Sequence, residues 1–397
     1  MLFSWYKRFF SQPHQPFFTS GILFFTLFMI LFILVYSNIL VLDTSILTYH
    51  AYSMVFVVFL QFFLGFLFVV FPKFLMQAEI SEKIYKRHFF AYFFNSLCIF
   101  LSLIFYSKIT FVFQIFLLIT QIFSFKLLLD IHKKSLVQIK NDTKWVLIAF
   151  FAGLISHFLF IISNLDFKYS FFISKIAINI GFYLFLFMIF LTISQRMIPF
   201  FTRAKVPNHV AYKSLKFLKI VFILLILKIV ILSFDDVRFN LISDIPLFFI
   251  ITKELIKWKL PIFKVEAIIW ILYLGLYWIV LGFFISIIES FFAIYNSSIY
   301  FEKIVIHSFA LGYFLTLLIG FGTRVILGHS GNQIVANKFT VIIFIALQFI
   351  VLLRLFSSIC SNFGLDYIFF LNLTAILLVL VLLVWSSKYI TILLKGK

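Results

Sequence analysis

Three histidines interrupt otherwise apolar stretches of this sequence, at His50, His157 and His307. Neutral imidazole is the commonest protein ligand for metals such as haem iron and copper. An ionisable side chain inside a membrane span is costly, so it is a candidate functional residue by default. These histidines are therefore candidate ligands of a metal ion or a haem if the chain brings them to one depth. The alternative is that each caps a helix or bonds to a neighbouring carbonyl.

A second polar group comes from two separate stretches, "QRMIPFFTR" at 195–203 and "FGTRVILGHSG" at 321–331. They supply Arg196, Arg324 and His329. Two guanidinium groups beside an imidazole can hold an anionic group such as a haem propionate through bidentate hydrogen bonds. Equally, the arginines can anchor the chain by reaching lipid phosphates. Pro199 is expected to end its helix and to free carbonyls near Arg196.

The elements that must position these residues are membrane-spanning helices. The chain has 397 residues, 64% of them hydrophobic and only 12% charged, about half the charge of a soluble domain. Runs of about 20 apolar residues recur, and each is long enough to cross a bilayer. We expect each run to form a helix, because an open strand would leave backbone hydrogen-bonding groups unpaired in lipid. We predict an all-α, polytopic membrane protein, a single integral-membrane domain over residues 1–397 without a soluble domain. Twelve runs are expected to span: 18–41, 50–71, 89–106, 109–131, 145–163, 170–195, 215–233, 239–256, 265–288, 304–327, 339–357 and 367–390.

The distribution of lysine and arginine tests the weakest run, 239–256, which contains Asp244 and Pro246. With twelve spans and the N-terminus inside, most basic residues fall in cytoplasmic segments, as the positive-inside rule requires. The outer segments hold only Lys108, Lys168, Arg238, Lys303 and Arg354. Omitting this run would reverse every later loop. We therefore predict twelve spans with both termini cytoplasmic. The net charge of +19 is then a topology signal and does not indicate nucleic-acid binding.

This topology predicts depths. His50 and His307 stand at the outer ends of their spans, and His157 lies about 9 Å short of an outer end at 1.5 Å per residue. His329 follows His307 by 22 residues, which is about 33 Å along a straight helix. His329 therefore cannot share a metal with His307. We place His50, His157 and His307 in one outer group, and His329, Arg196 and Arg324 in an inner group.

The remaining histidines, His14, His88, His132 and His209, lie in or beside lysine-rich loops, and we expect them to be solvated. Solvated polar side chains are the ordinary state of such loops.

Three lysines, Lys126, Lys175 and Lys228, lie inside predicted spans. A role in ion conduction is one interpretation, but acidic partners within the spans are nearly absent.

Cys98 and Cys360 occupy separate apolar runs, and the chain has no C-x-x-C-H sequence. This argues against a disulfide scaffold and against covalently attached haem.

Several stretches resemble the NnrS family. "HSFALGYFLTLLIGFGTRVILGHSG" (307–331) is similar to its tenth-helix signature, which ends in T-R-V-x-L-G-H-[ST]-G. "RMIPFFT" (196–202) resembles its R-V-I-P-F-F-T, and "HAYSMVFVVFLQFFLGFLFVVFPKF" (50–74) resembles its second helix. "LISHFLF" (154–160) stands where that family often has a histidine. The twelve-span layout resembles the family over essentially the whole chain.

The resemblance implies a bacterial inner-membrane protein that binds haem and copper and takes part in nitric oxide metabolism or nitrosative-stress tolerance. It implies no established reaction. The positions that match the motifs are His50, Arg196, Pro199, His307, Arg324, Gly328, His329 and Gly331, with His157 as a looser match.

The chain also departs from the family pattern. Where that pattern has a second histidine and a glutamate after the first histidine, this chain has Tyr52 and Ser53. The substitution removes a possible copper ligand and a carboxylate. Phe74 replaces a tryptophan, and Asn332 replaces an arginine.

These observations bear on three functions. The first is a haem-binding membrane protein that binds nitric oxide or a related small ligand at histidine-ligated iron. The second is a secondary transporter of a small solute without a metal cofactor, since twelve helices are common in that class. The third, a subunit of a haem-copper oxidase or nitric oxide reductase, requires more histidines within the spans than this chain has.

Overall fold

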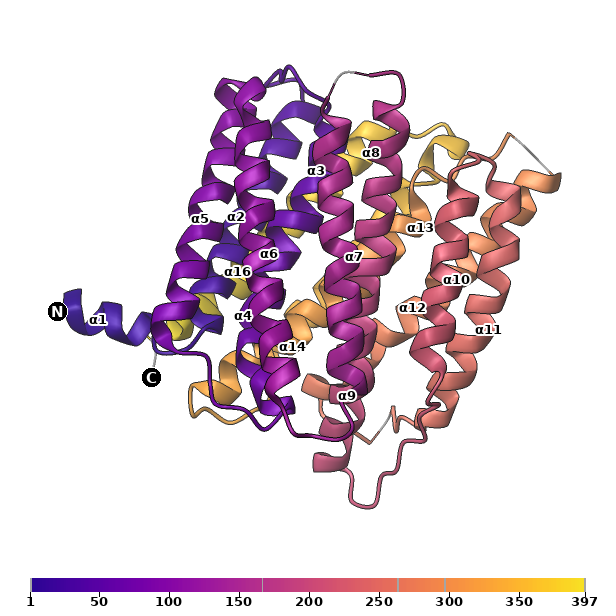
Figure 1. The fold of residues 1–397 in the computed structure, drawn as a ribbon. Helices are drawn as coiled ribbons and strands as arrows, with labels where there is room; N and C mark the ends of the chain where they lie inside the picture. Colours follow the sequence, from indigo (N-terminus) through magenta and orange to yellow (C-terminus); the bar gives the residue numbers. More distant parts are fainter. Residues whose placement is uncertain (1, 166, 263, 296–297, 396–397) are drawn as a thin grey trace. The chain divides into compact units, whose positions relative to one another are not determined.

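The computed structural model describes residues 2–165, 167–262, 264–295 and 298–395. Every regular element in these ranges is a helix (Figure 1). This confirms the all-α prediction. A short helix, α1 (Leu2–Phe9), precedes the first long one.

Ten helices of the described chain are long and apolar enough to cross a membrane, which confirms a multi-pass membrane protein. Some combine several elements, because α-helical and other helical turns follow one another without a break. The first five are α2 (His14–Tyr36), α3–η1–α4 (Ile46–Tyr52, Ser53–Val58 and Phe59–Phe74), α5 (Glu82–Phe105), η2–α6 (Ser107–Ile109 and Thr110–Lys134) and α7 (Asn141–Ser163). The other five are α8–η3–α9 (Ser170–Asn179, Ile180–Phe187 and Met188–Lys205), α12 (Ala267–Tyr295), α13–η5–α14 (Ile304–His307, Ser308–Leu315 and Thr316–His329), α15 (Lys338–Ser357) and α16 (Tyr367–Lys395).

The two remaining predicted runs also form helices, α10 (Phe217–Leu232) and α11 (Leu241–Trp258), joined through the short η4 (Val237–Asn240). They lie side by side in Figure 1 and pack against each other. Neither is among the ten helices that satisfy length and apolarity, because α10 has 16 residues and α11 carries Asp244, Lys253, Glu254 and Lys257. All twelve predicted runs are thus helical, and whether these two cross the membrane stays a prediction.

A last short helix, η6 (Cys360–Phe363), follows α15.

The chain forms two compact units. Unit 1 comprises residues 1–189 and 382–397, and unit 2 comprises residues 190–381. In unit 1, α2 packs against α4, α5 against α6, and α7 against α8 and η3. At one end of this unit, Nε2 of Gln15 in the first turn of α2 donates to the carbonyl of Leu393 near the end of α16, at 3.3 Å. The first and last spans therefore begin and end at the same level. That both termini are cytoplasmic stays a prediction.

In unit 2, the long helix α12 packs against α11, η5 and α14. The approach between α12 and η5 is close enough to require glycine. A Cβ atom on Gly312 would clash with Cδ2 and Cγ of Trp278. A side chain at this position would therefore force the two helices apart.

Three π-helical segments, η1, η3 and η5, interrupt three spans. These spans are the second, sixth and tenth predicted runs, and they are the most buried of the ten. π-helical turns are rare and occur frequently at functional sites. His50 lies three residues before η1, and His307 directly precedes η5. The backbone is thus irregular next to two of the predicted metal ligands.

Two expectations from the sequence are wrong. Pro199 does not end its helix, because α9 continues to Lys205. A proline within a membrane helix removes one backbone hydrogen bond, which neighbouring groups can replace. His14 is not solvated but 4% exposed, because it opens α2 at a point covered by other parts of the chain.

Candidate functional site

His157 is the most enclosed of the predicted ligands. It lies on α7 in unit 1 with no exposed surface. Its Nε2 is 2.9 Å from the hydroxyl of Tyr52, and its Nδ1 is 2.8 Å from Oε1 of Gln121 on α6. The ring of Phe56 stacks on the imidazole with a centroid distance of 4.5 Å. Three helical segments therefore hold this ring in one orientation.

These two contacts assign the tautomer of His157. An amide oxygen can only accept, so Nδ1 of His157 carries the proton and donates to Gln121. Nε2 then has the lone pair and accepts from the Tyr52 hydroxyl. The imidazole is neutral, as a metal ligand must be, but both its nitrogens are occupied. A metal could bind at Nε2 only after the Tyr52 hydroxyl moves away.

His50 faces a different side of α3 from Tyr52. Two residues along an α-helix are separated by about 200° of rotation, so their side chains point in nearly opposite directions. Tyr52 contacts His157 on α7, whereas the ring of His50 lies 4.7 Å from that of Phe32 on α2. Within unit 1, the structure therefore does not bring His50 and His157 together on one face.

Several buried polar residues of unit 1 lie on α6, and none of them was among the candidates predicted from the sequence. Gln121 supports His157, and Gln114 accepts a hydrogen bond from Asn164 at 2.7 Å. Ser124, one turn after Gln121 on α6, contacts Nδ1 of His88 at 2.9 Å. Thr110, Gln114, Gln121 and Ser124 are all buried. Their spacing of four, seven and three residues follows one face of a helix, so this stripe could have been found in the sequence.

His307 is the last residue of α13, in the first turn of the Ile304–His329 span, and it is half-buried. Its Nδ1 lies 2.9 Å from the carbonyl oxygen of Lys303 and 3.1 Å from Nη2 of Arg354. One nitrogen cannot donate to a carbonyl and also accept from a guanidinium. With the proton on Nε2, the ring accepts from Arg354, and with the proton on Nδ1, it donates to the carbonyl of Lys303. Histidines that bind metals commonly donate their second nitrogen to a carbonyl in this way, so a metal would bind at Nε2.

Arg354 is a second residue that the sequence analysis did not single out. It was counted as a loop residue, but it ends α15 with 4% of its surface exposed. Its Nη1 donates to the hydroxyls of Ser357 and Ser358 at 3.0 and 2.6 Å. A buried guanidinium beside His307 gives this end of unit 2 a fixed positive charge. No acidic residue lies near Arg354 in the sequence, so the sequence did not indicate that its guanidinium group is buried.

The inner group lies where α9 and α14 meet in unit 2. The guanidinium carbon of Arg324 stands 3.8 Å above the ring centroid of Phe201, which follows Arg196 on α9. Nη1 of Arg324 is buried and has no hydrogen-bond partner among the described residues. His329 is the last residue of α14, and Gly331 follows with φ of +77°, the left-handed conformation that commonly terminates a helix.

The outer and inner groups of unit 2 lie on one continuous helix. Seventeen residues separate His307 from Arg324, which is about 25 Å along a helix. One haem cannot be ligated by His307 and also place a propionate against Arg324. The two groups are therefore alternatives for one haem, or two separate sites.

No group of three or more His, Cys, Asp or Glu side chains with metal-binding geometry occurs in the part of the chain that the structure describes. His50 and His157 belong to unit 1, and His307 belongs to unit 2. The three-histidine metal site stays a prediction.

The chain was then compared with known proteins. The family model described as NnrS protein matches residues 8–397, nearly the whole chain. Searches of curated proteins and of solved structures give no match.

Proposed function

Since this chain belongs to the NnrS family, we propose that it is a haem-binding protein of a bacterial inner membrane that takes part in nitric oxide metabolism or nitrosative-stress tolerance. The family supports the class of protein, and the residues of unit 2 support a haem site. Histidine-ligated iron, when bound, supplies a coordination position for nitric oxide or a related small ligand.

One observation carries the assignment of the ligand. Nδ1 of His307 is directed at the carbonyl of Lys303 at 2.9 Å, which presents Nε2 as the ligating nitrogen. The buried Arg354 beside it supplies positive charge next to a group that carries carboxylates. His307 thus fits an axial ligand, and Arg354 fits a residue that favours the anionic cofactor there.

A second arrangement is favoured by Arg324. A buried guanidinium nitrogen without an acceptor is costly, and an anionic group would satisfy it. In this arrangement the haem lies at the inner group, with His329 as ligand and with Arg324 of α14 and Arg196 of α9 as the residues that would bind its propionates. The same chemistry also fits a lipid phosphate, in which case Arg324 serves as an anchor.

Copper fits the described residues less well. Tyr52 replaces the histidine of the family pattern, and its hydroxyl occupies Nε2 of His157. Binding of copper at His157 would require this hydrogen bond to break. We therefore propose haem as the principal cofactor, because a copper site shared by His50 and His157 would require Tyr52 to move away from His157 and His50 to turn from Phe32 on α2 toward α7.

The test is an optical spectrum and metal analysis of the purified full-length protein, produced with ample haem. We expect a Soret band that shifts when nitric oxide is added without oxygen. Loss of this band in His307→Ala, with retention in Arg324→Ala and His329→Ala, identifies the outer group. The reverse pattern identifies the inner group.

Matched controls are available for both groups. His209→Ala removes a loop histidine and Arg203→Ala an exposed arginine at the end of α9, and both should leave the spectrum unchanged. A wild-type protein without a Soret band would refute the haem proposal and favour a transporter.

A further inference from the structure

One ring nitrogen of His307 has two partners that require opposite protonation states. Nδ1 lies 2.9 Å from the carbonyl oxygen of Lys303 and 3.1 Å from Nη2 of Arg354. The carbonyl can only accept a hydrogen bond, and the guanidinium can only donate one. In a neutral imidazole, one nitrogen carries a proton and the other a lone pair. The partner that bonds to Nδ1 therefore decides whether Nε2 has the lone pair that a metal needs.

The carbonyl of Lys303 is the weaker of these two partners. It also accepts from the backbone N–H of His307, at 3.2 Å, within the first turn of the span. This oxygen is therefore satisfied even when the imidazole offers it no proton. Its contact with Nδ1 does not by itself fix the proton there.

Arg354 is the stronger partner, because its guanidinium is buried and held in place. The side chain is 4% exposed, and Nη1 donates to the hydroxyls of Ser357 and Ser358. These bonds orient the planar guanidinium and keep Nη2 directed at His307. A hydrogen bond from an ionised donor is roughly twice as strong as one between neutral groups. A proton on Nδ1 would instead place two donors opposite each other.

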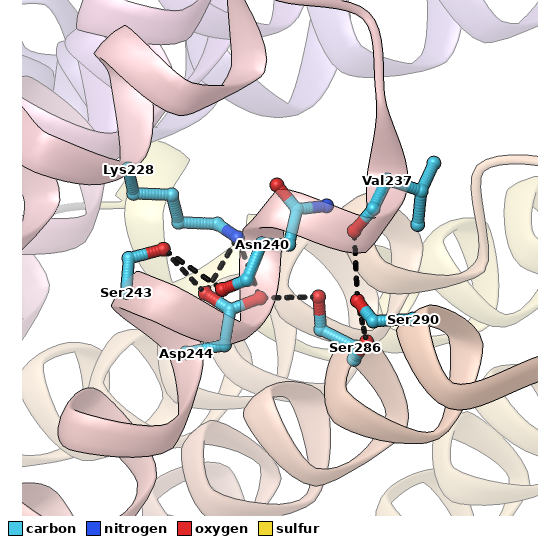
Figure 2. A network of polar contacts seen from close by, with 7 residues as sticks. All are labelled: Lys228, Val237, Asn240, Ser243, Asp244, Ser286 and Ser290. Atoms are coloured by element: carbon cyan, nitrogen blue, oxygen red, sulfur yellow. Dashed lines mark hydrogen bonds and ion pairs between the residues drawn. The ribbon is translucent and has the colours of Figure 1, made fainter. Parts of the chain in front are cut away.

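Lys228, another buried cation of unit 2, is bonded differently. Its Nζ lies 2.7 Å from Oδ1 and 2.9 Å from Oδ2 of Asp244. Ser243 and Ser286 donate to the same carboxylate (Figure 2). The charge of Lys228 is thus balanced by an anion on the next helix. The bonds of Arg354 described above lead to hydroxyls and to a ring nitrogen, so one of them depends on the protonation state of His307.

We propose that Arg354 is a positioning residue that holds His307, in the absence of a metal, in the tautomer with the proton on Nε2. This inference rests on the proposed function, in which His307 is the haem ligand. Ligation at Nε2 then requires one proton to leave Nε2 and one to enter at Nδ1, with no net change. Nδ1–H donates to the carbonyl of Lys303, and the bond from Arg354 breaks. Nη2 of Arg354 becomes available to an anionic group, so ligation and capture of a carboxylate are coupled.

Nuclear magnetic resonance of the full-length protein in lipid bilayers tests the proposal, because protonated and unprotonated ring nitrogens have different chemical shifts. The protein carries isotope-labelled histidine and is produced without haem, and the signals of His307 are those lost in His307→Gln. We expect the proton on Nε2 in the wild type. Arg354→Met removes the donor, so the proton should move to Nδ1. Arg354→Lys restores a cationic donor and should recover part of the wild-type signal.

The matched control is Lys228→Met/Asp244→Leu, which removes the other buried cation together with its carboxylate. It should leave the proton of His307 on Nε2. A wild type with the proton on Nδ1, or on both nitrogens, would overturn the role of Arg354. So would wild-type signals in Arg354→Met. If Arg354→Met does not fold, the wild-type tautomer alone still decides.

The two proposals can fail separately, because this measurement needs no haem. A protein with the Nε2 tautomer that never shows a Soret band would refute the haem proposal alone. A protein with a Soret band that depends on His307, but with the proton on Nδ1 before haem is added, would refute the role of Arg354 alone.

Discussion

The buried polar group of unit 1 is built from neutral side chains, whereas that of unit 2 is built from charges. His157, Tyr52 and Gln121 form a hydrogen-bonded set in which each contact has one donor and one acceptor. Lys228 and Asp244 form an ion pair with hydroxyl groups around it. Both groups have almost no exposed surface, so both depend on internal partners.

The difference between neutral and charged side chains decides how each buried group can respond when one of its partners is lost. A neutral network can release one ring nitrogen at the cost of a single hydrogen bond, about 1 kcal/mol net. It is therefore able to make room for a metal ligand bond. An ionic group must keep its charge balance whenever a partner changes. It is therefore sensitive to the loss of either charged partner.

The largest effect is expected when the ionic group loses one partner. Lys228→Met leaves Asp244 buried without a counter-charge, which should reduce the free energy of unfolding by about 3–5 kcal/mol. The double variant Lys228→Met/Asp244→Leu removes both charges and should recover most of that loss. Unfolding of the purified protein in detergent, followed by helix content, measures both. Equal stability of the single and double variants would contradict an ion pair.

A smaller effect is expected from the neutral group. His157→Phe fills the same space but leaves the Tyr52 hydroxyl and the Gln121 carbonyl without their partner, at about 1–3 kcal/mol. Adding Tyr52→Phe removes one of these groups and should return part of the stability in the same unfolding measurement. If His157→Phe costs as much as Lys228→Met, then His157 carries charge and the contrast between the units is wrong.

The smallest effect is expected from the exposed pair at η4. Hydrogen bonds from the side chain of Arg238 hold the pKa of Asp236 below its usual range. A carboxyl with a lowered folded-state pKa stabilises the fold above its unfolded pKa, about 4, and loses this contribution as the pH falls further. Because the pair is largely solvated, Asp236→Ala, which also removes the side-chain cap of η4, should lower the midpoint of unfolding only slightly at neutral pH. A marked loss would show that exposed charges matter as much as buried ones.

The positions of the helices could be predicted from the sequence. Each of the twelve apolar runs is a helix, including 239–256 with its Asp244 and Pro246. Local hydropathy and the need to satisfy the backbone in lipid are sufficient for this. A glycine after the last helical residues is a typical sign of a helix end. Gly331, which follows α14, adopts the left-handed conformation. The motif "TRVILGHSG", together with the stretches 50–74, 154–160 and 196–202, indicated the family that matches residues 8–397.

The partners of the polar side chains were not predictable in the same way. Lys228 was noted as a lysine without acidic partners, yet Asp244 on the next helix binds it. His50 and His157 were grouped by depth, yet Tyr52 is the residue of α3 that reaches His157. Depth follows from counting residues along one helix. Contact depends in addition on which face each helix turns toward its neighbour.

The sequence by itself determined the helical class, the order of the apolar runs and the family, because each of these follows from local residue patterns. Only the tertiary structure decided which nitrogen of His157 and His307 is engaged and which carboxylate neutralises Lys228. The physical reason is that most of these helices are apolar on nearly every side. A helix without a polar face gives no signal of its rotation, and its rotation is set by packing against other helices.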